Sequence, residues 1–233
     1  MSVPHAKSLI NRALGRRPAD SLEEIAYRRL VEKGFTPDGI IDVGAYQGEW
    51  TRLARRHFNA PVLMVEAQAA KRPYLDRVCA DLPRTMVESA VLGATAGETV
   101  TFYEMETGSS FLPEQSNAPR TATTLITSTL DTIAATLPGE ALFLKIDVQG
   151  AELHVLTGGT ATLARCALVQ LEVAVLSYNE GAPTMLEVLS WMDARGFVPF
   201  DLSGESRPMG HLVQIDILFV PRASKLRPDF IEF

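Results

Sequence analysis

Residues 39–51 read Gly-Ile-Ile-Asp-Val-Gly-Ala-Tyr-Gln-Gly-Glu-Trp-Thr, and this stretch decides the fold class. Its first half holds three apolar β-branched residues, which are typical of the end of a buried strand: Ile40, Ile41 and Val43. Gly44 and Gly48 flank a tight turn, and the amphipathic run 49–57 predicts a helix. A glycine at such a turn can adopt positive φ and lets a ligand approach the main chain. The stretch therefore predicts a strand, a ligand-binding turn and a helix.

The spacing of the glycines restricts the ligand. Dinucleotide-binding domains use Gly-x-Gly-x-x-Gly, which seats a pyrophosphate on the helix N-terminus. Here Ala45 and Tyr46 stand where the middle glycine would fall, which favours a smaller, zwitterionic group. Residues 42–48 resemble motif I of the class I methyltransferases, whose ligand is S-adenosylmethionine, and an ordinary βα turn is the alternative. The resemblance implies that five residues of this loop bind the cofactor: Asp42, Gly44, Tyr46, Gln47 and Gly48.

Composition places the chain among globular proteins with one core. Its 233 residues are 46% hydrophobic, and we expect a single domain over residues 21–233. A net charge of −6 disfavours broad binding to nucleic acid, which depends on many Lys and Arg contacts to phosphate. Cys79 and Cys166 lie far apart and predict buried free thiols, compatible with a reducing compartment. Because there is no apolar run of about 20 residues and no signal-peptide pattern, we expect a cytoplasmic protein without a membrane span.

The N-terminal region divides into two parts. Residues 1–20 are polar and basic and predict a loosely ordered leader. Ser21 and Glu24 have the spacing of a capping box, so a helix should follow and end at Gly34. We expect this helix, residues 21–34, to cover the sheet and to close a cofactor cleft. Its apolar face also offers a surface through which two copies could pair as a homodimer.

Strands and helices alternate along the rest of the chain. The strands expected in the main sheet are 40–43, 60–66, 85–92, 141–147, 167–173, 197–202 and 212–220, with 97–104 as a further, half-exposed strand. The helices expected between them are 49–57, 69–80, 131–137, 151–156 and 184–195. This order predicts a doubly wound α/β fold: a Rossmann-like, mostly parallel, seven-stranded sheet. Because the short segment 203–210 suits a hairpin, the last strand should be antiparallel.

Polar residues near the predicted strand ends suggest where a nucleoside would lie. Glu66 ends the second strand about 20 residues after the glycine turn, where such folds hold ribose hydroxyls. The turn around Glu88, Ser89 and Ala90, within the stretch 85–92, should lie beside the adenine ring. The stretch 106–123 lacks periodicity, and a loop this long predicts a lid or substrate loop. Three of its residues should face the cleft: Ser109, Ser110 and Phe111.

The most specific motif begins at Leu144 and reads Leu-Lys-Ile-Asp-Val-Gln-Gly-Ala-Glu-Leu-His-Val-Leu. Together with Leu-Asp at 130–131 and Val-Gln-Leu-Glu-Val at 169–173, it resembles the FkbM family of S-adenosylmethionine-dependent methyltransferases, over roughly residues 38 to 220. That family carries a closely similar Lys-Ile-Asp-Val-(Glu or Gln)-Gly-Ala-Glu block. The resemblance implies methyl transfer to a hydroxyl of a sugar, a glycoconjugate or a secondary metabolite.

The catalytic candidates follow from the fold, in which ligands sit beyond the carboxyl ends of the strands. Four carboxylates fall at such ends: Asp42, Glu66, Asp147 and Glu172. Lys145 shares a strand face with Asp147 and, with a sulfonium cofactor, would offset their repulsion. We expect Asp147, which should also contact the cofactor, to be the general base. His211 is the second candidate, because a hairpin would bring it to the same edge, although it could equally be a surface residue.

Several alternatives stay open. Asp147 and Glu172, with His211 or Asp216, could bind Mg²⁺, but no local ligand motif is present and we prefer a site without a metal. The same fold also serves N-methyltransferases and macromolecule methylases. A nucleotide-dependent oxidoreductase is disfavoured by the missing middle glycine, and a non-catalytic scaffold by the intact motif residues. The acceptor itself is not encoded in any recognisable motif.

Overall fold

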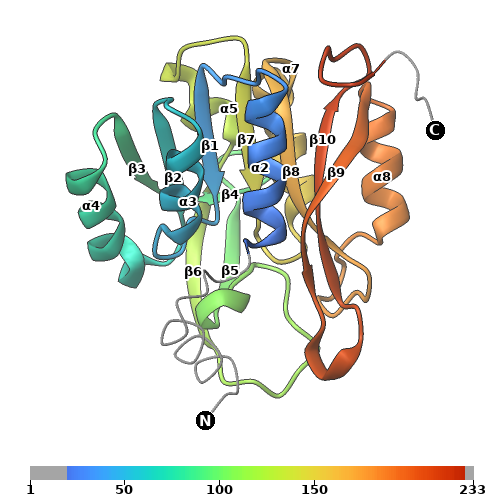
Figure 1. Cartoon of the computed structure of the whole chain (residues 1–233). Coiled ribbons are helices and arrows are strands. Elements are labelled where there is room, and N and C mark those ends of the chain that lie inside the picture. Colours follow the sequence, from blue (N-terminus) through green and yellow to red (C-terminus); the bar gives the residue numbers. More distant parts are fainter. Residues whose placement is uncertain (1–19, 229–233) are drawn as a thin grey trace, which may run out of the picture.

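A twisted seven-stranded sheet forms the centre of the computed structural model, which describes residues 20–228 (Figure 1). In spatial order, its strands are β3 (Thr85–Ser89), β2 (Val62–Glu66), β1 (Gly39–Val43), β7 (Leu142–Ile146), β8 (Cys166–Ala174), β10 (Gln214–Pro221) and β9 (Phe197–Ser206). The pairs among β3, β2, β1, β7 and β8 are parallel, and β10 is antiparallel to both β8 and β9. The predicted doubly wound fold with an antiparallel last strand is therefore confirmed.

The final hairpin is longer than the sequence suggested. We expected residues 203–210 to connect the two strands, but β9 continues to Ser206, which pairs with Gln214. The pairing is irregular near Asp216 and Leu218, where the register shifts. At such a shift the alternation of inward-facing and outward-facing side chains is interrupted, although the strand continues. The end of the strand is therefore difficult to locate from the sequence.

Helices cover both faces of the sheet. They are α2 (Leu22–Glu32), α3 (Glu49–His57), α4 (Arg72–Asp81), α5 (Leu130–Ile133), α6 (Glu152–Thr157), α7 (Thr160–Ala164) and α8 (Met185–Asp193). Every residue of β1, β2 and β7 is buried, because successive side chains point to opposite, covered faces. Ile40 belongs to the buried cluster that contains residues of α2, α3 and α4, whereas Ile41 belongs to the cluster that contains residues of α5 to α8.

The N-terminal helix α2 begins as expected. Ser21 accepts a hydrogen bond from the Glu24 N–H, and the Glu24 carboxylate accepts one from the Ser21 N–H. Tyr27 is fully buried in the sheet face, and its hydroxyl donates to Gln170 at 2.5 Å. The helix covers the sheet next to β9, but the cavity described below is lined by no described residue of α2, so the helix does not close that cleft. Residues 1–19 of the expected leader lie outside the described residues.

A second, three-stranded sheet has the order β4 (Val91–Leu92), β6 (Thr121–Ser128) and β5 (Thr99–Glu104). It corrects two expectations. The strand expected over 85–92 breaks at Ala90, and its last two residues join the small sheet in parallel with β6. The loop expected over 106–123 ends at 120, because Thr121 already pairs with Glu104. Within the described range, no helix is long and apolar enough to cross a membrane.

Candidate active site

A cavity of about 240 Å³ opens at the carboxyl ends of β1, β2 and β7, where the strand order reverses. The glycine turn, the segment after β2, the turn after β3, the long loop 105–120 and the end of β7 form its walls. Ser109, Ser110 and Phe111 line it, as the sequence predicted. The predicted site residues that line it are Gly44, Tyr46, Glu66, Ala90, Lys145 and Asp147.

Gly44 allows the turn after β1 to pack against the turn after β7. Its φ is +76°, and a Cβ at this position would lie 1.9 Å from the carbonyl oxygen of Asp147. Gly48 has a different role from the one expected, because a Cβ there would lie 2.6 Å from Cγ2 of Val78, on α4. Gln47 and Gly48 are not among the residues that line the cavity. The first glycine shapes the cavity, and the second allows close packing of helices.

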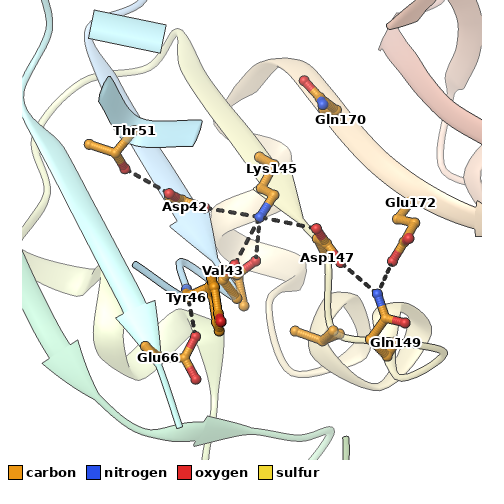
Figure 2. Close-up of polar contacts among 12 residues, drawn as sticks. Asp42, Val43, Tyr46, Thr51, Glu66, Lys145, Asp147, Gln149, Gln170 and Glu172 are labelled. Carbon is orange, nitrogen blue, oxygen red and sulfur yellow. Dashed lines mark hydrogen bonds and ion pairs between the residues drawn. The ribbon is translucent and has the colours of Figure 1, made fainter. Parts of the chain in front are cut away.

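Glu66 places a buried carboxylate at the cavity wall (Figure 2). The backbone N–H groups of Tyr46 and Gln68 each donate to one of its oxygens at 2.8 Å. Burial raises the pKa of this carboxyl, and the two backbone hydrogen bonds partly oppose that effect. Each oxygen keeps a lone pair, so the group can accept further hydrogen bonds from hydroxyls in the cavity.

Asp42 does not line the cavity, contrary to expectation. It is fully buried, accepts a hydrogen bond from Thr51 Oγ1 at 2.6 Å and lies 3.1 Å from Lys145 Nζ (Figure 2). Lys145 Nζ also donates to the carbonyl of Gly44 at 2.9 Å and lies 3.6 Å from Asp147. Burial lowers the pKa of Lys145, but Asp42 and Asp147 outweigh it and raise the pKa above its ordinary value. Asp42 therefore holds a buried ammonium in place.

Asp147 and Glu172 form a linked carboxyl pair. Gln149 Nε2 donates to Asp147 at 3.0 Å and to Glu172 at 2.5 Å (Figure 2). Burial acts to raise the pKa of Asp147, but the Lys145 ammonium and hydrogen bonds from Glu172 and Gln149 hold it below its ordinary value. For Glu172, burial and the adjacent Asp147 charge raise the pKa well above its ordinary value. The Lys145 ammonium thus favours the ionised form of Asp147, whereas burial and the Asp147 charge favour the protonated form of Glu172.

Three further predicted residues lie away from the cavity lining. Glu172 faces a small polar hollow beyond Gln149. Ser89 is exposed beside Arg72, whose guanidinium lies 3.4 Å from the Ser89 hydroxyl. His211 is exposed in the β9–β10 connection and does not line the cavity. Within residues 20–228, no group of three or more His, Cys, Asp or Glu side chains is arranged to hold a metal ion.

Sequence reasoning missed the residues that fasten the long loop over the cavity. The Glu106 carboxylate accepts from Tyr46 Oη and Lys71 Nζ, both at 2.7 Å. The Glu106 carbonyl accepts from Gln68 Nε2 at 2.9 Å. Two aromatic lining residues were also missed, Trp50 and Phe102. These contacts join segments far apart in the chain, and no local pattern predicts them.

Comparisons with known proteins place the chain in a family. A family model described as the methyltransferase FkbM domain matches residues 42–199, more than half of the chain. No curated protein matches the sequence.

Similar solved structures include EvdMO1, at 14% identity and a TM-score of 0.49, which covers 86% of this chain and 41% of that chain. Another is 1,6-didemethyltoxoflavin-N1-methyltransferase of Burkholderia thailandensis, at 13% identity and a TM-score of 0.49. The match covers 95% of this chain and 91% of that chain. Magnesium protoporphyrin IX methyltransferase of Synechocystis PCC 6803 has 11% identity and a TM-score of 0.47. The match covers 86% of this chain and 77% of that chain. The chain spans less than half the length of EvdMO1. With the family model over its central part, the chain belongs to the FkbM family of S-adenosylmethionine-dependent methyltransferases.

Proposed function

We propose that this methyltransferase binds S-adenosylmethionine in the described cavity and methylates a hydroxyl of a sugar, a glycoconjugate or a secondary metabolite. Different lining residues suit the ribose, methionine and adenine parts of this cofactor. Glu66 can accept from the two ribose hydroxyls, and the main chain at Gly44 and Tyr46 can approach the methionine part. Apolar side chains suited to the adenine ring follow β3: Ala90, Val91 and Leu92. When bound, the cofactor supplies an electrophilic methyl group on a sulfonium.

Asp147 carries the proposal for a hydroxyl acceptor. Its carboxylate lines the cavity, is 41% exposed and is kept ionised by Lys145. An ionised carboxylate in this position can accept a hydrogen bond from an acceptor hydroxyl, orient it and take its proton as the O–C bond forms. General-base assistance of this kind contributes about 10²–10⁴-fold in rate. Orientation of the oxygen toward the methyl carbon contributes further.

We also infer a cellular location and an oligomeric state for the protein. Cys79 and Cys166 are free thiols, which supports a cytoplasmic, reducing environment. Val31 of α2 is 44% exposed, so this helix has an apolar side chain available for pairing with a second copy. Light scattering of the full chain, compared with a Val31→Glu variant, tests the pairing. A monomeric wild-type protein would contradict it.

Methyl-transfer assays test the acceptor class. The full chain is incubated with cofactor carrying a ¹³C methyl group and panels of sugars, glycosides, polyketide-type hydroxyls and amines. NMR of the product identifies the atom that receives the label. We expect an O-methyl product, and Asp147→Asn should lose about 10²–10⁴-fold in turnover while it still binds the cofactor. Methylation of nitrogen alone, or full turnover by Asp147→Asn, would overturn the proposal.

A further inference from the structure

Gln149 lies in an unusual backbone conformation between the ends of β7 and β8. Its φ is +54°, in the left-handed region that side-chain-bearing residues seldom adopt, and Gly150 follows at +93°. Such strain is kept where the surrounding structure requires it and often marks a functional site. This conformation brings the side chain of Gln149 between Asp147 and Glu172 (Figure 2).

Both the nitrogen and the oxygen of the Gln149 side-chain amide form hydrogen bonds. Its nitrogen donates to Asp147 Oδ1 and to Glu172 Oε2, and its oxygen accepts from the Tyr178 hydroxyl at 2.9 Å. The Tyr178 hydroxyl in turn accepts from Gln214, at the start of β10. A side chain held at three points has little freedom to move, so the carboxyl groups it contacts are held as well.

Tyr178 extends this network to the loops at the cavity mouth. Its carbonyl accepts from the Gln115 N–H at 2.7 Å, and the next residue, Asn179, donates from its side chain to the Leu112 carbonyl at 2.9 Å. Both partners belong to the long loop, of which Ser109, Ser110 and Phe111 line the cavity. Gln149 therefore joins the cavity carboxylate to the loop that covers the cavity.

We propose that Gln149 is the positioning residue of the methyl-transfer site, which fixes Asp147 toward the cavity and pairs it with Glu172 so that both carboxyls share the proton released by the acceptor. This inference rests on the proposed hydroxyl methylation. In that step the acceptor O–H bond breaks, the oxygen bonds to the methyl carbon, and the electron pair of the S–C bond stays on sulfur. The proton passes to the Asp147–Glu172 pair.

The charges around the pair set its response to pH. Lys145 faces Asp147 from β7 and is itself paired with Asp42 on β1. Glu172 is surrounded by Asp147, by Glu152 of α6, by Asp216 of β10 and by the Tyr178 hydroxyl. Gln149 donates to the ionised form of Asp147, so its loss should raise the pKa of Asp147. The acid limb of the kcat/KM profile should then move to higher pH.

Three variants of the full chain test this role. Gln149→Ala removes both donors, Gln149→Glu keeps the shape but donates only when its carboxyl is protonated, and Glu98→Ala, at an exposed residue outside this network, is the control. We expect Gln149→Ala to keep its cofactor affinity, to lose roughly 10- to 100-fold in kcat and to shift its acid limb upward. Gln149→Glu should work at low pH and lose activity as the introduced carboxyl ionises. Profiles of Gln149→Ala and Gln149→Glu that coincide with those of wild type and Glu98→Ala would overturn the inference.

A second measurement does not depend on turnover. ¹³C NMR of carboxyl-labelled protein without cofactor follows the titration of Asp147, whose signal is identified through Asp147→Asn. We expect the Asp147 signal to titrate at higher pH in Gln149→Ala, and an unchanged titration would refute the positioning role even if the acceptor class were wrong. If Gln149→Ala fails to fold, Tyr178→Phe, which removes the hydroxyl that donates to Gln149, replaces it in both measurements. A shifted carboxyl titration without any methyl transfer to hydroxyls would instead contradict the proposed function alone.

Discussion

At the residue scale, Glu66 allows the proposed cofactor site to be tested separately from the proposed catalytic base. Its two oxygens each accept a backbone N–H and keep a further lone pair, and the residue lines the cavity. Hydrogen bonds to a charged group contribute about 1.5–3 kcal/mol. We expect Glu66→Ala to weaken binding of S-adenosylmethionine by about 10- to 150-fold without loss of the fold, as measured by calorimetric titration. Glu98→Ala, at an exposed glutamate, is the control, and equal affinities in the two variants would remove Glu66 from the ribose site.

The close packing around Gly44 leads to a prediction about the stability of a variant. Gly44→Ala would place a methyl group 1.9 Å from the Asp147 carbonyl oxygen, in addition to the cost of a positive φ. Gly97 has a similar φ of +86°, but beyond its two chain neighbours no atom of the described chain lies within 4 Å of its added Cβ. We expect Gly44→Ala to lower the free energy of unfolding by about 1–3 kcal/mol more than Gly97→Ala does, as measured in urea. The same loss in both variants would show that only the backbone conformation matters.

Individual residues differed in how well the sequence predicted them. Glu66 and Asp147 reach the cavity because they end or follow strands whose direction the hydrophobic pattern fixes. Asp42 lies within its strand and turns to Lys145, a partner more than 100 residues away. The bonds of Gln149 to Glu172 and Tyr178 were also missed, because they depend on the positive φ of Gln149 and on how three segments meet.

At the element scale, the pairing of β8 with β10 places Asp216 opposite Glu172. Burial, and then the negative charges of Asp147 and Glu23, raise the pKa of Asp216 to about 7, with Lys145 opposing them. An aspartate in the unfolded chain ionises near pH 3.9. The folded state therefore binds the proton more tightly, and its stability should fall as pH rises from about 4 to about 7.

This linkage gives a measurable difference. Asp216→Asn resembles the protonated side chain, so its free energy of unfolding should exceed that of the wild type by about 1–3 kcal/mol at pH 8 and by much less at pH 5. Denaturant titrations at the two pH values measure this difference, with Glu98→Gln as a control that should show none. A gain of equal size at both pH values would mean that packing, and not ionisation, is responsible.

Strands with a continuous apolar run of their own were predictable from the sequence. Strands that exist only because they pair with a distant segment were not. The strands β1, β2 and β7 are wholly buried, so their continuous apolar runs indicated them directly. By contrast, β6 begins just after a loop rich in Ser and Pro, and its first four residues, Thr-Ala-Thr-Thr, resemble that loop. Only the pairing with β5 makes it a strand. The two-residue β4 is likewise defined by β6.

At the scale of the whole molecule, the site forms where the sheet changes direction. The chain passes from β1 to β2 on one side and returns as β7 on the other, so a cavity opens between the turns that follow these strands. The long loop crosses this opening and is fastened by Glu106 to Lys71 and Tyr46. The fold thus assembles the cavity wall from segments spread over more than 100 residues of the chain.

The most direct test of this account is calorimetric titration of the full chain with S-adenosylmethionine and, separately, with NAD, each with and without Mg²⁺. The turn after β1 has Ala45 and Tyr46 in place of the middle glycine that a pyrophosphate needs, and Glu66 stands at the cavity wall. We therefore expect saturable binding of S-adenosylmethionine that does not depend on Mg²⁺ and is weakened by Glu66→Ala, with no binding of NAD. Binding of NAD in its place, or a folded protein that does not bind S-adenosylmethionine, would contradict the assignment of the cavity.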